Sequence, residues 1–95
     1  MFPGTTSKLS ESAVTAAATI NPKTDMIRVS GATAIVNIVP NFGGGFSGIL
    51  FVVPLAVFTW TAAGNISIAG TSVINKMIVF VYSKVTGKWY PSVLA

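Results

Sequence analysis

The sequence predicts an all-β protein, built as a small single-domain antiparallel β-sandwich or barrel. Short runs rich in β-branched and aromatic residues recur about every ten residues, and glycine, proline or asparagine separates them. No run shows the apolar stripe of a helix with a capping residue at each end. A chain of 95 residues is long enough for one domain with a small core.

The expected strands are each bounded by residues that interrupt pairing. They cover residues 26–30, 33–39, 49–53, 56–61 and 65–69. In the fourth of these strands, Phe58 and Trp60 alternate with Thr59 and Thr61, which predicts one buried and one solvated face. Residues 13–20 mix alanines that favour a helix with Val, Thr and Ile that favour a strand, and we interpret them as extended. We identify no internal repeat.

The C-terminal segment predicts a closing β-hairpin. Residues 77–82 are strand formers, residues 83–87 provide a turn, and residues 88–90 form the returning strand. Gly87 stands where such a loop requires a left-handed residue. Pro91 ends the pairing, because it has no amide hydrogen to donate.

The N-terminal residues differ in composition from the rest of the chain. Residues 1–12 are rich in Gly, Thr, Ser and Pro, which predicts an extended arm, and residues 13–95 form the β domain. Our hypothesis is that the arm docks on a neighbouring protein. Phe2 and Leu9 would be its apolar anchors, Pro3 would stiffen it, and Lys8 would add a cation.

The charge content predicts self-association. Hydrophobic residues make up 52% of the chain and charged residues 8%, against about 25% in a typical domain. Residues 29–75 carry no charge at all. A folded monomer of this size exposes roughly 5,000 Å², which eight charged side chains cannot cover. We therefore expect a homo-oligomer, most simply a homotrimer, with a subunit interface formed by Phe51, Val53, Val57, Phe58 and Trp60.

Several function classes are not expected. The chain has no cysteine and no histidine, so we expect no thiol catalysis, no metal site and no cofactor. Glu11 and Asp25 are its two carboxylates, and Glu11 falls in the predicted arm, so an acid–base pair and enzyme activity are not expected. The six Lys and Arg residues are dispersed along the chain, so we expect no binding of nucleic acid. The glycines of residues 41–48 match no phosphate-binding spacing.

A membrane protein is the weakest of the alternatives. Residues 46–63 are nearly continuous apolar sequence of membrane-spanning length. Pro54, the alternation at Thr59 and Thr61, and the lack of flanking basic clusters favour two buried strands instead. We therefore expect no membrane partner.

The aromatic residues admit two interpretations. They could pack in the core, which we favour for so short a chain, or form a surface that stacks on sugars or anchors a protein. The residues concerned are Phe58, Trp60, Phe80, Tyr82, Trp89 and Tyr90.

The spacing of several short motifs resembles that of small β-rich virion proteins of tailed bacteriophages. The motifs are Gly64-Asn65-Ile66, the apolar strand to Tyr82, and Gly87-Lys88-Trp89-Tyr90-Pro91, within residues 26–92. This resemblance implies a capsid decoration (cement) protein, commonly a trimer, that binds the major capsid protein on the outer surface of the virion head. The alternative is a fibre or receptor-binding module of a phage tail or head. The resemblance carries over no individual functional residue, because such modules act through surfaces.

Overall fold

Nine β-strands and no helix make up the part of the chain that the structure, a computed structural model, describes: residues 11–40 and 47–92. This confirms the all-β prediction. The strands are β1 (Glu11–Thr15), β2 (Thr19–Ile20), β3 (Met26–Ser30), β4 (Asn37–Ile38), β5 (Gly48–Pro54), β6 (Thr59–Trp60), β7 (Gly70–Thr71), β8 (Ile78–Ser83) and β9 (Lys88–Pro91).

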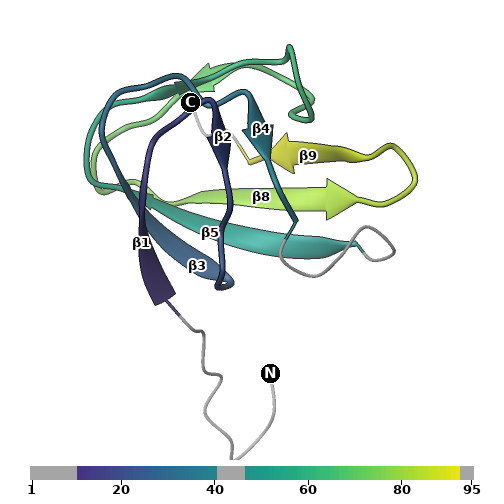
Figure 1. The fold of residues 1–95 in the computed structure, drawn as a ribbon, viewed down its shortest axis with the longest axis horizontal. Helices are drawn as coiled ribbons and strands as arrows, with labels where there is room; N and C mark the ends of the chain where they lie inside the picture. Colours follow the sequence, from purple (N-terminus) through teal and green to yellow (C-terminus); the bar gives the residue numbers. More distant parts are fainter. Residues whose placement is uncertain (1–10, 41–46, 93–95) are drawn as a thin grey trace, which may run out of the picture.

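Five of these strands form one sheet in the order β1-β3-β5-β8-β9 (Figure 1). The first three strands pair in parallel, and β5, β8 and β9 pair antiparallel. The prediction of an antiparallel sheet is therefore wrong for its first half. Among the described strands, β1 and β9 do not pair with each other, so the sheet is open and no closed barrel forms.

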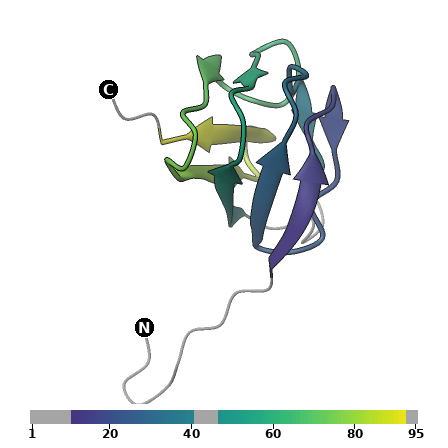
Figure 2. The same cartoon turned by 90° about the vertical axis from the view of Figure 1, so that its left-hand side faces the viewer.

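The parallel pairing arises because the first half of the chain winds in stacked turns. Each of β1, β3 and β5 leads to a short strand in a second layer, and β2 pairs with β4 in parallel. The amide of Ala16 donates to the carbonyl of Ser30 (2.7 Å), and the amide of Val39 donates to that of Ile20 (3.0 Å). Figure 2 shows β1 and β3 side by side and pointing the same way. Parallel neighbours require such a crossover between them.

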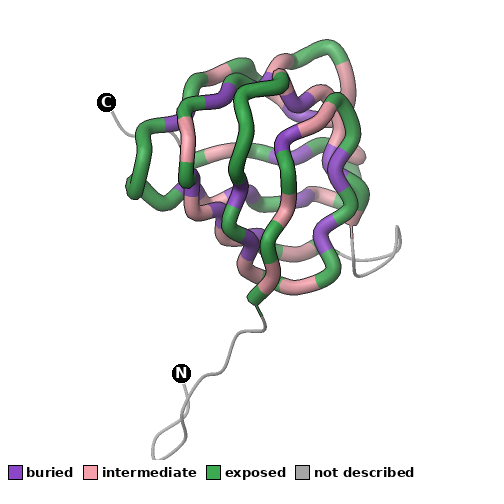
Figure 3. Tube along the Cα trace, turned by 60° about the vertical axis from the view of Figure 1, so that its left-hand side comes forward, coloured by how far each residue is buried: buried purple, intermediate pink, exposed green. Residues whose placement is uncertain are grey.

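The core lies between the five-stranded sheet and the short pairs β2–β4 and β6–β7. Buried residues alternate with more exposed ones along the longer strands, as the colours of the described residues show in Figure 3. The rings of Trp60 and Phe80 pack edge to face at 5.5 Å between centroids, and those of Tyr82 and Trp89 lie 5.1 Å apart. The buried apolar cluster is Ala16, Ile20, Ile27, Val29, Ile35, Ile38, Leu50, Val52, Phe58, Trp60, Ile66, Ile78, Phe80, Tyr82 and Trp89.

The C-terminal hairpin matches its prediction closely. Strand β8 pairs with β9 so that Tyr82 lies opposite Trp89 and Ser83 opposite Lys88. Gly87 has a φ of 69° and donates its amide hydrogen to the carbonyl of Ser83 at 2.8 Å. The left-handed residue of the turn is thus the predicted glycine.

Other element boundaries differ from the prediction. The expected strand 65–69 is wrong: within it, Ile66 makes one isolated bridge to Trp89, and β7 begins at Gly70. The expected strands 33–39 and 56–61 shrink to β4 and β6, and between them only an isolated parallel bridge joins Ile35 to Trp60. Residues 13–20 are extended in two pieces, the end of β1 and β2, with a bend at Ala18 between them, and β1 already begins at Glu11, inside the segment assigned to the arm.

Candidate functional site

The outer face of the five-stranded sheet, away from the core, is the most apolar exposed surface that regular strands build in this protein. Alternate residues of a strand point to opposite faces, so the partners of the buried Leu50 and Val52 point outward. Ile49 lies opposite Val81, and Val81 lies opposite Tyr90; one row further, Met26, Phe51 and Val79 lie side by side. We define the outer patch as Met26, Ile49, Phe51, Val53, Val79, Val81 and Tyr90.

Solvent reaches this outer patch directly. Ile49 is 49% exposed, Val81 44% and Tyr90 43%, while the remaining members are half-buried against their neighbours. A sheet with one solvated face normally places polar residues there. Strands β5 and β8 instead carry apolar residues on both faces, which is typical of a strand covered on both sides.

A polar border surrounds part of the outer patch. Arg28 lies opposite Val53 in the sheet, and its Nε atom pairs with Oε2 of Glu11 at 2.7 Å. Both side chains are about two-fifths exposed (44% and 41%), so this ion pair adds little stability. An apolar centre with a polar rim is the usual anatomy of a protein–protein interface.

The structure separates the residues predicted to form the subunit interface. Phe51 and Val53 belong to the outer patch. Val57 is exposed (51%) but lies in the connection between β5 and β6. Phe58 and Trp60 are buried in the core, with 1% and 2% exposure, so they are not available to a partner.

The predicted interface left out five of the seven members of the outer patch. All five fall in expected strands, and their apolar character at alternate positions was visible: Met26, Ile49, Val79, Val81 and Tyr90. The sequence does not show which strands are neighbours. The structure places β5, β8 and β9 next to one another, so their outward residues share one face. Of the aromatic residues considered for a sugar-binding surface, five are buried and Tyr90 is exposed. The arm residues Phe2, Pro3, Lys8 and Leu9 lie outside the described residues.

The motifs that carry the phage resemblance have a structural role in this fold. The side chain of Asn65 accepts the amide hydrogen of Ile38 (2.8 Å) and donates to the carbonyl of Ile38 (2.6 Å), as a neighbouring strand would. The indole Nε1 of Trp89 donates to the same carbonyl at 3.0 Å. A side chain at Gly64 would overlap the Oδ1 atom of Asn37, which accepts the amide hydrogen of Asn65. Asn65 and Trp89 therefore hold β9 against β4 through their hydrogen bonds to Ile38.

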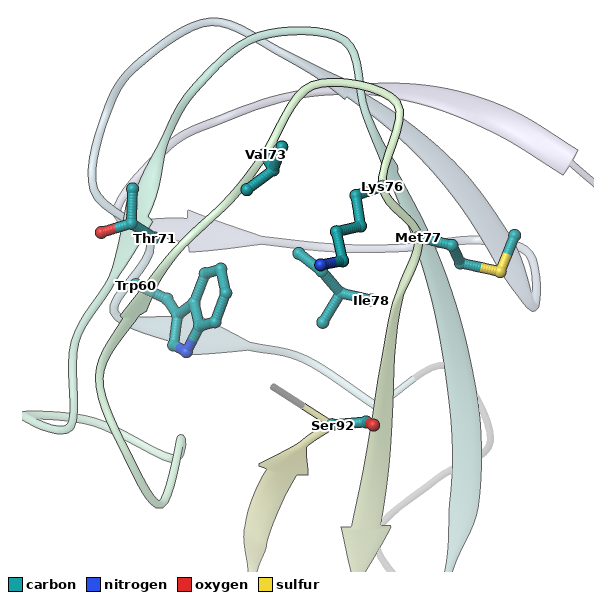
Figure 4. A pocket seen from close by; sticks show the side chains of 7 residues that line it. All are labelled: Trp60, Thr71, Val73, Lys76, Met77, Ile78 and Ser92. Carbon is teal, nitrogen blue, oxygen red and sulfur yellow. The ribbon is translucent and has the colours of Figure 1, made fainter. Parts of the chain in front are cut away.

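A small pocket opens between the segment that precedes β8 and the pair β6–β7 (Figure 4). Its volume is about 30 Å³, about twice the ~10–15 Å³ that one water molecule needs. Trp60 forms one wall, and its Nε1 atom is buried without an acceptor among the described residues. The lining residues are Trp60, Thr71, Val73, Lys76, Met77, Ile78 and Ser92.

No cluster of metal-ligating groups is present in the described part of the chain. No group of three or more Asp, Glu, His or Cys residues gathers there in a way that could hold a metal ion. Helices that are long and apolar enough to cross a membrane are likewise absent from residues 11–40 and 47–92. Comparisons with protein-family models, with curated proteins and with solved structures find no match to this chain.

Proposed function

We propose that this protein is a non-catalytic structural component of a phage virion that decorates the outer surface of the head. In this proposal it binds the major capsid protein as a homotrimer and stabilises the contacts between capsid subunits. Ligands that bind only the assembled state stabilise that state by mass action. The motif spacing that resembles decoration proteins supplies the virion context.

The observation that carries this proposal is the outer patch. Its apolar side chains lie on an exposed sheet face that no described part of the chain covers. Covering apolar area contributes about 25 cal/mol per Å², so a partner of matching shape would gain stability there. Obligate interfaces are more apolar than transient ones, which fits a subunit that remains bound.

A catalytic role finds less support. The chain has no histidine or cysteine, and Glu11, one of its two carboxylates, is engaged with Arg28. The alternative of a fibre or receptor-binding module needs exposed aromatic residues for host glycans. Of the six aromatic residues considered, Tyr90 is the one exposed member.

The first test places one charge inside and one outside the outer patch. We expect Val81→Asp to reduce capsid occupancy at least about tenfold, since burying an unpaired carboxylate costs several kcal/mol. Val85→Asp is the matched control, because Val85 is 87% exposed in the hairpin turn outside the outer patch. Occupancy is measured by sedimenting intact capsids with each variant and quantifying the bound chain.

The same measurement separates the alternatives. Wild-type protein bound in numbers comparable with the major capsid protein supports decoration, whereas a few copies per virion would support a fibre module. Equal occupancy of the two aspartate variants would show that the outer patch is not the binding surface.

A further inference from the structure

The pocket beside Trp60 combines a buried donor, a cation and an apolar rim. Each of these features lacks a partner within the described residues. Lys76 is exposed, and the ion pair between Arg28 and Glu11 is the one that the described residues contain. The whole sequence has two acidic side chains, Glu11 and Asp25. Glu11 pairs with Arg28, and neither of the two forms an ion pair with Lys76.

The position of Lys76 is fixed by an ordered turn. Its amide donates to the carbonyl of Val73 at 3.0 Å, and Asn75 adopts a left-handed conformation with φ of 65°. The amide of Asn75 donates to the carbonyl of Pro54 at 3.0 Å, which ties the turn to the end of β5. Asparagine tolerates this conformation better than most residues do. In Figure 4 the side chain of Lys76 curls inward, with its ammonium group over the pocket on the side of Trp60.

The groups around this ammonium are suited to oxygen acceptors. The indole of Trp60 can only donate a hydrogen bond, and the hydroxyls of Ser92 and Thr71 can donate as well. The buried Nε1 atom of Trp60 has no acceptor among the described residues. The pocket volume of about 30 Å³ admits one group of the size of a carboxylate.

The apolar rim of the pocket mouth is Val73, which lines the pocket and is 57% exposed. Met77 also lines the pocket, but its side chain points away from it in Figure 4. The Val73 side chain cannot recognise a free anion, but it can contact an apolar residue beside an acidic one. Charge complementarity and the rim together select a protein segment rather than a lone ion.

We propose that this pocket is a docking site for an acidic side chain, Asp or Glu, of a partner protein, flanked in the partner by an apolar residue. The carboxylate sits under the Lys76 ammonium, with one oxygen directed at the Trp60 indole, and the flanking residue covers Val73. The pocket shares no lining residue with the outer patch, so this proposal is independent of the capsid proposal.

The test uses the whole protein and two synthetic peptides that differ in one group. The probes are acetyl-Gly-Leu-Asp-Gly-amide, its Asn counterpart, and sodium acetate, each titrated into ¹⁵N-labelled protein. We expect the aspartyl peptide to shift the Trp60 indole N–H signal and the Met77 and Ile78 amides. Its affinity should exceed that of the asparaginyl peptide by up to about fivefold, the size of a partly exposed ion pair.

Two charge-removing variants complete the test. Lys76→Gln should abolish the preference for the aspartyl peptide, while Lys84→Gln, in the exposed hairpin turn, should retain it. Unchanged signals elsewhere in the spectrum show that each variant is folded. Three results would overturn the inference: no shift with either peptide, equal affinity for both, or shifts with acetate as large as those with the aspartyl peptide. None of them affects capsid occupancy, so failure here leaves the proposed function intact.

Discussion

Asn65 shows how one side chain can replace a strand. Its amide group satisfies both backbone hydrogen-bonding groups of Ile38, which would otherwise face an empty edge of β4. The backbone of Asn65 also pairs with β9, because its carbonyl accepts the amide hydrogen of Trp89 at 2.8 Å. A single residue therefore joins two strands that come from distant parts of the sequence.

Removing this amide should be costly. We expect Asn65→Ala to lower the free energy of unfolding by about 1–3 kcal/mol, because the amide of Ile38 loses its acceptor, while the Ile38 carbonyl loses one donor and keeps the Trp89 indole. Asn65→Asp keeps the acceptor and loses the donor, so its cost should be intermediate; the indole of Trp89 still donates to the Ile38 carbonyl. Urea unfolding followed by tryptophan fluorescence measures both values. A loss below about 0.5 kcal/mol for the alanine variant, the level of an ordinary surface change, would show that these hydrogen bonds do not matter.

At the scale of elements, the strands that depend on local pattern were predictable. The hairpin of β8 and β9 is encoded by a run of strand formers, a short turn and Gly87, all close in sequence. The parallel pairing of β1, β3 and β5 joins residues far apart in the sequence, such as Met26 and Phe51. Strand propensity does not reveal such pairs. One signal was present: Ile20-Asn21-Pro22 and Ile38-Val39-Pro40 share an Ile-x-Pro pattern, and Ile20 pairs with Ile38.

The candidate site was predictable only in part, for the same reason. Phe51 and Val53 were correctly placed on a strand, but the sequence does not show that β5 is central to the sheet. Phe58 and Trp60 were grouped with them because of the uninterrupted apolar run. The structure shows that the chain turns a corner after Pro54, so the two aromatic rings enter the core instead.

Strand β5 offers a matched pair of neighbouring valines. Val52 is 2% exposed in the core, and Val53 lies on the outer patch. We expect Val52→Ala to cost about 1–3 kcal/mol of stability through the cavity it leaves. Val53→Ala should cost less than about 1 kcal/mol, since its methyl groups are half-exposed. Chemical denaturation of the two variants checks this difference, and equal losses would mean that both faces of β5 are covered in the isolated chain.

At the scale of the whole molecule, the two faces of the sheet differ in how they are covered. The inner face is packed under the second layer, while the outer patch is left to solvent. A stable interface needs roughly 1,000 Å² or more of buried surface. A patch that extends over β3, β5, β8 and β9 offers a surface on which such an interface can be built.

The assembly prediction follows from this asymmetry. We expect the wild-type chain to sediment as a trimer at micromolar concentration. Val53→Asp should shift it to a monomer, because the substitution places a charge on the β3–β5 side of the outer patch, where we predict the subunit interface; Val81 and Tyr90 lie on the β8–β9 side, which is left for the capsid. Val57→Asp, on an exposed corner, should leave the trimer in place. Analytical ultracentrifugation gives the masses, and circular dichroism confirms that each variant is folded; a monomeric wild-type chain would contradict the prediction.

The hydrogen bond from the Trp89 indole to the carbonyl of Ile38 joins residues 51 positions apart. Strand β9 is the last strand that the structure describes, yet its Trp89 is buried in the core and its indole holds β4 in place. During synthesis the chain leaves the ribosome from its N-terminus, so the early turns emerge before the residue that fixes them. We therefore expect these turns to reach their full stability only after β9 has been synthesised.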